Sequence, residues 1–412
     1  MTGGESRASE FARGWKALLA ATLGVACGAS PVPFNAIGAF LGPFNKELGW
    51  SFRNVSLGIT LFGVTAACLA PLYGSWADRY GVRRVALLSL AAFGVAFAAF
   101  ALTPASLPGF YALWLLLGLV GIGSTPVTWS RAVNLWFVRR RGLALGILLM
   151  GTSLTVIVVP PLTVYAIREL GWRPAFVVLS MLPLLVALPI AYFLFREPTA
   201  AERPRELSTA DGHALLGESL RVAMRGRRFW IIFASILVVA FAYGGAHVHM
   251  VEMLGLKGLA REDAAKVMGV LGASIFVGRI ATGLLLDRYW APLVTLPILC
   301  LPAVSCWLLS DDSITMATAS AAGIFLGFAA GAETDLIAYL AGRYFGMAHY
   351  GKIYGSLYMP FGIASAVSPA VYGWVRDSTG NYDAMLGVAA VMFVAGGLVL
   401  LALGRYPDFR PG

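Results

Sequence analysis

Apolar residues occur along this chain in long, nearly uninterrupted runs, and polar residues are confined to the segments between them. A helix needs about 20 apolar residues to cross the hydrocarbon core of a bilayer. Runs of about this length predict twelve membrane-spanning helices, at 17–41, 55–76, 85–103, 109–137, 143–166, 175–195, 229–251, 265–286, 292–310, 314–341, 353–375 and 384–404. We therefore expect an all-α membrane protein, with a six-helix bundle over 1–195, a cytoplasmic central loop over 196–228 and a second, pseudo-symmetric six-helix bundle over 229–412.

Composition supports the membrane interpretation. Of the 412 residues, 58% are hydrophobic and only 13% are charged, whereas a soluble protein has about 25% charged residues. The net charge of +10 comes from basic residues scattered between apolar runs, so no concentrated basic face for a nucleic acid is present. The four cysteines lie inside apolar runs and form no metal-binding or disulfide pattern. We expect no nucleic-acid partner, no metal and no cofactor.

The positions of the basic residues predict the orientation of the chain. Cytoplasmic loops of membrane proteins carry an excess of Lys and Arg. When the N-terminus is placed inside the cell, most of the 31 lysines and arginines fall in inside segments. We therefore expect a multi-pass, monomeric protein of the plasma membrane (the inner membrane of a bacterium), with both termini cytoplasmic.

The two predicted bundles repeat each other in sequence. At an offset of 209 residues, Gly74–Tyr80 corresponds to Gly283–Tyr289, Gly63 to Gly272 and Gly142 to Gly351, and at 208 Trp136–Phe137 corresponds to Tyr344–Phe345 and Pro161 to Pro369. Landmarks in the same order at one offset indicate duplication of a six-span unit. Such duplications place a substrate site between the halves, near the middle of the membrane.

The loop between the second and third spans resembles a known signature. Gly74-x-x-x-Asp78-Arg79-x-Gly81-x-Arg83-Arg84 is similar to the signature loop of the major facilitator superfamily, and Gly283, Asp287 and Arg288 form a degenerate second copy. The resemblance implies a cytoplasmic latch in which Asp78 accepts hydrogen bonds at a helix N-terminus, favoured by the helix dipole. The arginines are expected to pair across the loop.

A narrower resemblance concerns the loops after spans one and four. Leu41–Ser51 and Trp136–Gly146 are similar to the oxalate/formate and monocarboxylate transporter branch of this superfamily. Arg279 lies where that branch carries its anion-binding arginine, although Ile275 replaces an acidic residue that some members have one turn earlier. The resemblance implies transport of a small organic anion, most simply a monocarboxylate.

Four ionisable residues lie deep inside predicted spans: Arg131, Arg279, Glu333 and Asp335. A charge in hydrocarbon is costly, so such residues face a cavity or a partner and are functional candidates. The guanidinium of Arg279 can bind a carboxylate in two places, which predicts a substrate site. The alternative is a structural pair with Asp335 or Glu333, and both arrangements can coexist if substrate displaces a carboxylate.

Glu333 and Asp335 are two residues apart and point about 200° away from each other on a helix. One of them is a candidate for proton coupling, and the alternative is a static gate contact with Arg131. His247 and His249 also alternate faces, near the outer end of span seven, and either is a candidate for an outer proton-sensing gate or an interfacial hydrogen bond. Small polar and aromatic residues of spans one, five, seven and eleven are candidates for cavity lining or for packing: Asn35, Thr152, Tyr243, Tyr358 and Phe361.

Together these features predict a secondary active transporter that moves a small organic anion by alternating access, with a proton as a candidate co-substrate. The alternative within this class is efflux or exchange of another small solute. An intramembrane enzyme is disfavoured because the chain has no nucleophile–base motif and no metal-ligand cluster at membrane depth.

Overall fold

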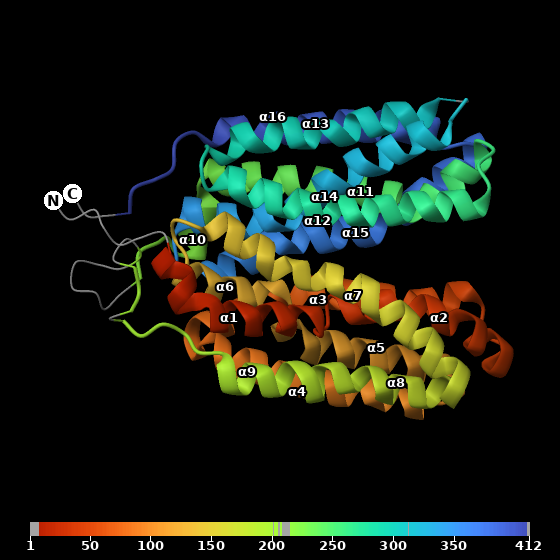
Figure 1. Ribbon diagram of the computed structural model, residues 1–412, viewed down its shortest axis with the longest axis horizontal. Helices are drawn as coiled ribbons and strands as arrows, with labels where there is room; N and C mark the ends of the chain where they lie inside the picture. Colours follow the sequence, from red (N-terminus) through yellow and green to blue (C-terminus); the bar gives the residue numbers. More distant parts are fainter. Residues whose placement is uncertain (1–7, 201, 205–206, 208–214, 312, 410–412) are drawn as a thin grey trace. The chain divides into compact units, whose positions relative to one another are not determined.

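The computed structural model describes residues 8–200, 202–204, 207, 215–311 and 313–409, and the described chain is almost entirely helical (Figure 1). Its only β-type pairing is an isolated bridge between Gly217 and Gly346. The α-helices are α1 (Ala8–Ala26), α2 (Pro31–Leu48), α3 (Phe52–Tyr80), α4 (Val82–Ala98), α5 (Leu107–Gly121), α6 (Pro126–Trp136), α7 (Arg141–Leu170), α8 (Trp172–Met181), α9 (Leu188–Leu194), α10 (Leu220–Arg225), α11 (Arg227–Leu256), α12 (Arg261–Leu286), α13 (Ala291–Ser310), α14 (Met316–Phe345), α15 (Tyr350–Thr379) and α16 (Asp383–Leu400). The all-α membrane architecture is confirmed.

Eleven helical segments in the described chain are long and apolar enough to cross a membrane. They match the predicted spans except the eleventh, 353–375, which lies inside the 30-residue helix α15. Helix α15 is not among the eleven apolar segments, and it contains Lys352, Arg376, Pro360 and Pro369. The prediction of twelve spans is therefore met by eleven apolar segments and one long helix of lower hydropathy.

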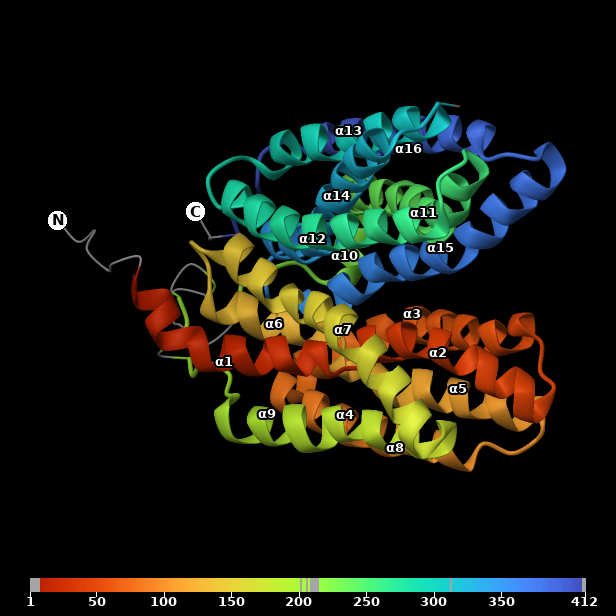
Figure 2. The same ribbon diagram turned by 45° about the vertical axis from the view of Figure 1, so that its right-hand side comes forward.

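The described chain divides into two compact units. The first comprises Met1–Glu218, Gly346–Ser356 and Phe409–Gly412, and the second comprises Ser219–Phe345 and Leu357–Asp408. In both views of the ribbon, α13 and α16 lie side by side in the second unit, and α4 lies beside α8 and α9 in the first (Figures 1 and 2). The first turns of α15 thus belong with the helices of the first bundle, a long-range grouping that the linear division of the sequence does not contain.

The first unit contains two interrupted spans whose breaks meet. The predicted span 17–41 consists of α1 and α2, and the fourth consists of α5 and α6, joined by a 3₁₀ turn at Ile122–Ser124. Pro31 and Pro126 begin the second helix of each pair, where a missing N–H is tolerated. Ser124 closes the junction, because its Oγ accepts a hydrogen bond from the Ala29 amide at 3.0 Å and donates one to the Gly121 carbonyl at 2.7 Å.

Aromatic side chains form the core of the first unit near the α2–α3 turn. Phe44 contacts the rings of Trp50, Phe110 and Trp172 at centroid distances of 5.8, 5.5 and 4.8 Å. Phe40 stacks on Phe176 at 4.0 Å. Buried aromatic pairs of this kind add specific ring contacts to the burial of their large apolar surface, so this cluster holds α2, α5, α8 and the α2–α3 turn together.

In the second unit α12 and α14 approach each other at backbone distance. A Cβ atom added to Gly278 would lie 2.2 Å from the Phe328 carbonyl oxygen, and one added to Gly331 would lie 2.8 Å from the Arg279 amide nitrogen. Small residues permit such an approach between membrane helices. The contact brings the part of α14 that carries Glu333 and Asp335 against the turn of α12 that carries Arg279.

Candidate functional site

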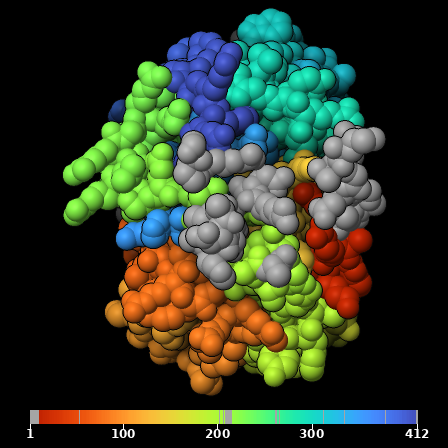
Figure 3. Space-filling view, turned by 90° about the vertical axis from the view of Figure 1, so that its left-hand side faces the viewer, coloured from red at the N-terminus to blue at the C-terminus, as the bar shows by residue number. Residues whose placement is uncertain are grey.

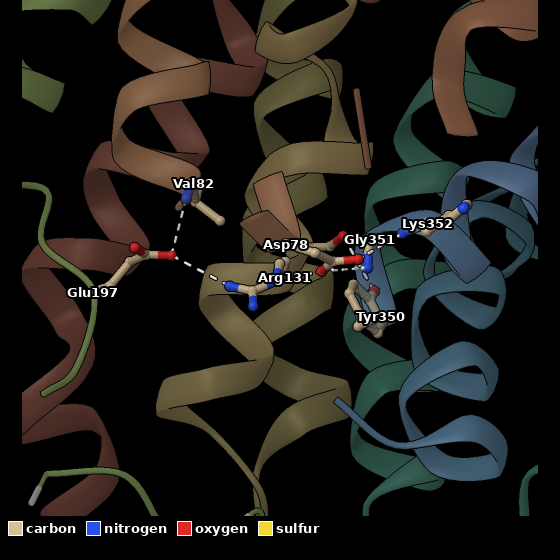
Figure 4. A network of polar contacts seen from close by, with 8 residues as sticks. Asp78, Val82, Arg131, Glu197, Tyr350, Gly351 and Lys352 are labelled. Carbon is tan, nitrogen blue, oxygen red and sulfur yellow. Dashed lines mark hydrogen bonds and ion pairs between the residues drawn. The ribbon is translucent and has the colours of Figure 1, made fainter. Parts of the chain in front are cut away.

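The signature loop of the first unit is organised around Asp78, at the end of α3 (Figure 4). Its carboxylate accepts hydrogen bonds from the backbone amides of Gly351 and Lys352, each at 2.9 Å, in the first turn of α15. A carboxylate at a helix N-terminus satisfies unpaired N–H groups and is favoured by the helix dipole. The expectation that Asp78 accepts hydrogen bonds at a helix N-terminus is therefore met by α15.

Two glycines of this loop have a steric or conformational requirement. A Cβ atom on Gly74 would lie 1.8 Å from the Gly351 carbonyl oxygen, so only glycine permits this approach of α3 to α15. Gly81 links α3 to α4 with φ +85°, a conformation that favours glycine. These requirements explain the residue type at two positions of the signature.

Arg131 is the positively charged partner of Asp78 in the first signature loop. Its Nε lies 2.7 Å from Asp78 Oδ1 and its Nη1 lies 3.4 Å from Glu197 Oε1, so the guanidinium stands between two carboxylates, as Figure 4 shows. The side chains of Arg131 and Asp78 are only 8% and 9% exposed. Glu197 also accepts a hydrogen bond from the Val82 amide at 3.0 Å and thereby ties the start of α4 to the segment after α9.

The loop arginines behave differently from the expectation that they pair across the loop. Arg79 lies over the ring of Tyr80 at 5.2 Å. Arg83 donates a hydrogen bond to the Tyr192 carbonyl at 2.6 Å and lies over the Tyr192 ring. Both side chains therefore contact tyrosines.

The second copy of the loop, at Gly283, Asp287 and Arg288, has the same scaffold with different chemistry. Gly283 is buried, Asp287 is half-buried and Arg288 is exposed. The Tyr406 hydroxyl accepts a hydrogen bond from the Ala291 amide at 2.9 Å, and the Tyr339 hydroxyl donates one to the Leu286 carbonyl at 2.7 Å. Tyrosines hold this copy together at the positions where the first copy uses Glu197 and Arg131.

The second unit contains a buried cluster of charges. Arg279 on α12 and Glu333 on α14 are each 6% exposed, and Asp335 is 1% exposed. Arg279 interacts electrostatically with Asp335 and with Tyr243 of α11, and Tyr243 also interacts with Glu333. The structure thus brings together three of the four charges that the sequence placed inside spans, whereas Arg131 belongs to the latch of the first unit.

Glu333 and Asp335 differ in their surroundings, in keeping with their opposite directions on the helix. Asp335 is an electrostatic partner of Arg279. Glu333 Oε1 is buried and has no hydrogen-bond partner among the described residues. Asp335 Oδ2 is likewise buried without a hydrogen-bond partner there, so what separates the two carboxyl groups is their electrostatic partner: Arg279 for Asp335 and Tyr243 for Glu333. Of the two pairs that the sequence left open for Arg279, the electrostatic interaction is with Asp335.

The two histidines of α11 have separate partners. His247 Nδ1 lies 3.2 Å from the Tyr243 hydroxyl, which connects it to the Arg279 cluster. His249 lies 2.9 Å from both the Pro369 carbonyl and the Tyr382 hydroxyl and so joins α11 to α15 and to the start of α16. No group of three or more His, Cys, Asp or Glu residues in the described chain could hold a metal ion.

The remaining candidates for cavity lining have local contacts. Asn35 donates a hydrogen bond to the Pro31 carbonyl at 2.7 Å, and Thr152 donates one to the Leu149 carbonyl at 2.8 Å, both within their own helices of the first unit. Tyr358 and Phe361 contact each other at 5.2 Å in the second unit. Their role as substrate contacts stays a prediction.

Several functional contacts were not found from the sequence. Glu10 accepts hydrogen bonds from the backbone amides of residues 138, 139 and 140, and Glu197, Tyr339 and Tyr406 close the two loop copies. The repeat offset contained a signal for some of them. Glu197 and Tyr406 are 209 residues apart in the sequence. Each accepts a hydrogen bond from a backbone amide, Glu197 from Val82 and Tyr406 from Ala291, and these two donors are also 209 residues apart.

Residues 23–369 match the profile of the Major Facilitator Superfamily. The chain belongs to this superfamily. It is a membrane transporter and not an enzyme.

Similar proteins include an uncharacterised MFS-type transporter of Bacillus subtilis, 24% identical over 60% of this chain and 59% of that protein. Monocarboxylate transporter 13 of Bos taurus is 26% identical over 90% of this chain and 83% of its own length. A probable sulfoacetate transporter of Cupriavidus necator is 25% identical over 89% of this chain and 90% of its own length. The sequence therefore resembles the monocarboxylate branch of the superfamily.

Solved structures show the same fold. The proton:xylose symporter XylE aligns with a TM-score of 0.75 at 13% identity and covers 98% of each chain. The human organic anion transporter MFSD10 aligns with a TM-score of 0.72 at 16% identity, over 94% of this chain and 99% of that chain.

Proposed function

We propose that this protein moves a small monocarboxylate across the membrane by alternating access and that Arg279 binds the carboxylate of the substrate. The observation that carries the proposal is a buried guanidinium inside a span, which interacts electrostatically with Asp335 on α14 and with Tyr243 on α11. A planar guanidinium binds a carboxylate through two parallel hydrogen bonds. Relatives named for monocarboxylate and sulfoacetate transport support an anionic, carboxylate-bearing substrate.

We assign the co-transported proton to Glu333. The charged groups that act in this cluster are Arg279 and Asp335, with Tyr243 and its partner His247 as the neighbouring titratable groups. Asp335 interacts electrostatically with Arg279, whereas the partner of Glu333 in this cluster is a tyrosine, Tyr243, and Glu333 Oε1 is buried without a hydrogen-bond partner in the described chain. A charge left unpaired in a membrane span is costly, so Glu333 is the group that gains most from carrying a proton.

The location and orientation are part of the same proposal. The distribution of Lys and Arg supports a chain with both termini in the cytoplasm, in the inner membrane of a bacterium. In that orientation both signature loops face the cytoplasm.

The substrate assignment is tested by uptake into proteoliposomes. Labelled lactate, pyruvate, formate, oxalate and sulfoacetate are offered to the wild type and to Arg279→Lys. Lysine keeps the charge and loses the two-point geometry, so the KM for the transported acid rises about tenfold or more. Arg225→Lys, an exposed arginine of α10, serves as the matched control and retains the wild-type KM.

Proton coupling is tested with two neutralising variants of the same helix. Uptake by Glu333→Gln loses its stimulation by an inward proton gradient, whereas Asp335→Asn retains that stimulation and changes KM. A gradient response that survives in Glu333→Gln rejects this proton site. Absence of uptake of any carboxylate by the wild type, with or without a gradient, rejects the monocarboxylate proposal in favour of efflux or exchange of another solute.

A further inference from the structure

The second copy of the signature loop opens onto a cavity of about 640 Å³ in the second unit. The cavity lies where α12 ends and α13 begins, and the segment after α16 completes its wall. On this face the dark blue C-terminal segment borders the turquoise part of the chain that contains α12 and α13 (Figure 3). The charge cluster around Arg279 contributes no residue to the lining, so the cavity is a separate site.

Three arginines line this cavity: Arg288, Arg343 and Arg405. Within the described part of the chain, none of them forms an ion pair with a carboxylate. The guanidinium of Arg343 lies 4.3 Å from the centroid of the Tyr406 ring, and its Nε is buried without a hydrogen-bond partner among the described residues. Asp287 is the single carboxylate of the lining and has an interaction of its own. The cavity therefore has a surplus of positive charge and donors.

The first copy of the loop shows what is missing from the second. At the repeat offset of 209, Tyr406 stands where the first copy has Glu197, and at 208 Tyr339 stands where it has Arg131. Glu197 accepts hydrogen bonds from an amide and from Arg131. In the second copy the tyrosine hydroxyl accepts the hydrogen bond of the corresponding amide, but no carboxylate of the described residues forms an ion pair with the three arginines. An external anion would supply the missing charge.

We propose that this cavity binds the phosphate group of an anionic membrane phospholipid. Basic pockets at the ends of membrane helices are suited to such headgroups. Arginine offers several N–H donors in a planar fork that matches phosphate oxygens. The cation–π contact with Tyr406 holds Arg343 at the wall of the cavity.

The surroundings favour a lipid over a free anion. Leu285 and Leu401, within one turn of the lining residues Leu286 and Gly404, are 38% and 36% exposed on helices that are apolar enough to span a membrane. Tyr289 and Trp290 line the cavity and are the residue types that collect at the membrane–water interface. Acyl chains would thus lie on the exposed apolar helices while the phosphate reaches the arginines.

The test is native mass spectrometry of the full-length protein in detergent, titrated with dioleoylphosphatidylglycerol and, separately, with dioleoylphosphatidylcholine. The triple variant Arg288→Gln/Arg343→Gln/Arg405→Gln is compared with Arg84→Gln/Arg221→Gln/Arg225→Gln, which removes the same charge at exposed arginines outside the cavity. Each lining arginine contributes about fivefold to the affinity for an anionic lipid. The first variant therefore binds phosphatidylglycerol on the order of a hundredfold more weakly, and the control binds it like the wild type.

A second pair of variants tests the site without removing an arginine. Tyr406→Glu places a carboxylate where the first copy has one. Tyr406→Gln introduces a side chain of the same shape as glutamate without its charge. Both variants lose the ring that contacts Arg343, and only Tyr406→Glu adds a negative charge, so we expect Tyr406→Glu to bind phosphatidylglycerol much more weakly than Tyr406→Gln. Equal binding by these two variants, or equal binding by the two triple variants, overturns the site. Displacement of phosphatidylglycerol by inorganic phosphate in modest excess overturns the lipid assignment in favour of a free anion.

Discussion

The two copies of the signature loop share a backbone arrangement and differ in charge. In the first, Asp78 and Glu197 enclose Arg131 and accept hydrogen bonds from three backbone amides. In the second, the hydroxyl of Tyr406 accepts the corresponding amide and Tyr339 donates to a carbonyl. One backbone group is satisfied at the corresponding place in both copies, the amide of Val82 in the first and of Ala291 in the second. At this position the duplicated fold uses a hydrogen-bond acceptor, which is charged in one copy and neutral in the other.

This difference separates two kinds of buried charge. Arg131 in the first unit is paired within the latch, although the sequence placed it at membrane depth together with Arg279. Arg279, Glu333 and Asp335 in the second unit have no part in a loop and interact across α12 and α14. Ionisable residues at similar depth in a duplicated sequence can thus serve a structural latch in one half and a candidate substrate site in the other.

The largest effect is expected from a methyl group placed between α3 and α15. Gly74→Ala puts a Cβ atom 1.8 Å from the Gly351 carbonyl oxygen, so the helices must separate and the hydrogen bonds of Asp78 must break. We expect a loss of more than about 4 kcal/mol in the free energy of unfolding. The measurement is the thermal midpoint of the purified protein in detergent.

The matched control is Gly272→Ala in α12. A Cβ atom there meets nothing within 4 Å, and alanine is favoured over glycine in a helix by up to about 1 kcal/mol. Its midpoint should stay the same or rise. Equal behaviour of the two variants would contradict the close approach of α3 and α15.

The next effect concerns the charge pair of the latch. Asp78→Ala leaves Arg131 buried with Glu197 as its remaining ionic partner and exposes two amides of α15. Removing one member of a buried pair costs about 3–5 kcal/mol. The double variant Asp78→Ala/Arg131→Tyr, which introduces the residue type of the second copy at position 339, should recover a large part of the lost thermal stability. A double variant as unstable as Asp78→Ala would show that helix capping, and not charge, dominates.

The sequence predicted the helices well and the contacts between them partly. Apolar runs predict spans because a membrane helix satisfies its backbone internally, and the breaks at Pro31 and Pro126 were missed because proline inside an apolar run is tolerated there. Asp78 was assigned to a helix N-terminus, but α15 could not be named as the partner because Gly351 is 273 residues away. Glu197 lies outside the signature motif and becomes part of the site only through the fold.

A smaller effect is expected when the hydrogen-bond acceptor of one loop copy, Glu197 or Tyr406, is changed. Glu197→Tyr keeps an oxygen near the Val82 amide and removes the second carboxylate of Arg131, so the thermal stability falls by about 1–3 kcal/mol. Tyr406→Phe removes only the acceptor of the Ala291 amide, at a cost of about 1 kcal/mol. Both are measured as thermal midpoints in detergent, and a larger loss for Tyr406→Phe would contradict the ranking of the two copies.

The smallest effect involves the arginines that follow each half. Arg196 and Arg405 are 209 residues apart. Arg196 is paired with Glu202 at 2.7 and 2.8 Å, whereas Arg405 lines the cavity of the second unit. The hydrogen bond from Arg196 is the main cause that lowers the pKa of Glu202 to about 2, with a further contribution from the Thr199 amide.

Because the pKa of Glu202 is lower in the folded protein than its ordinary value of 4.5, the carboxylate stabilises this segment above that value. The contribution is lost progressively as the pH falls from 4.5 toward 2. The Thr199 amide, which donates to Glu202 at 3.0 Å, should exchange its hydrogen more slowly in the wild type than in Glu202→Gln at neutral pH. The ratio of the two exchange rates should approach one as the pH falls through this window. A ratio that is independent of pH would show that the loop backbone, and not the carboxylate, protects this amide.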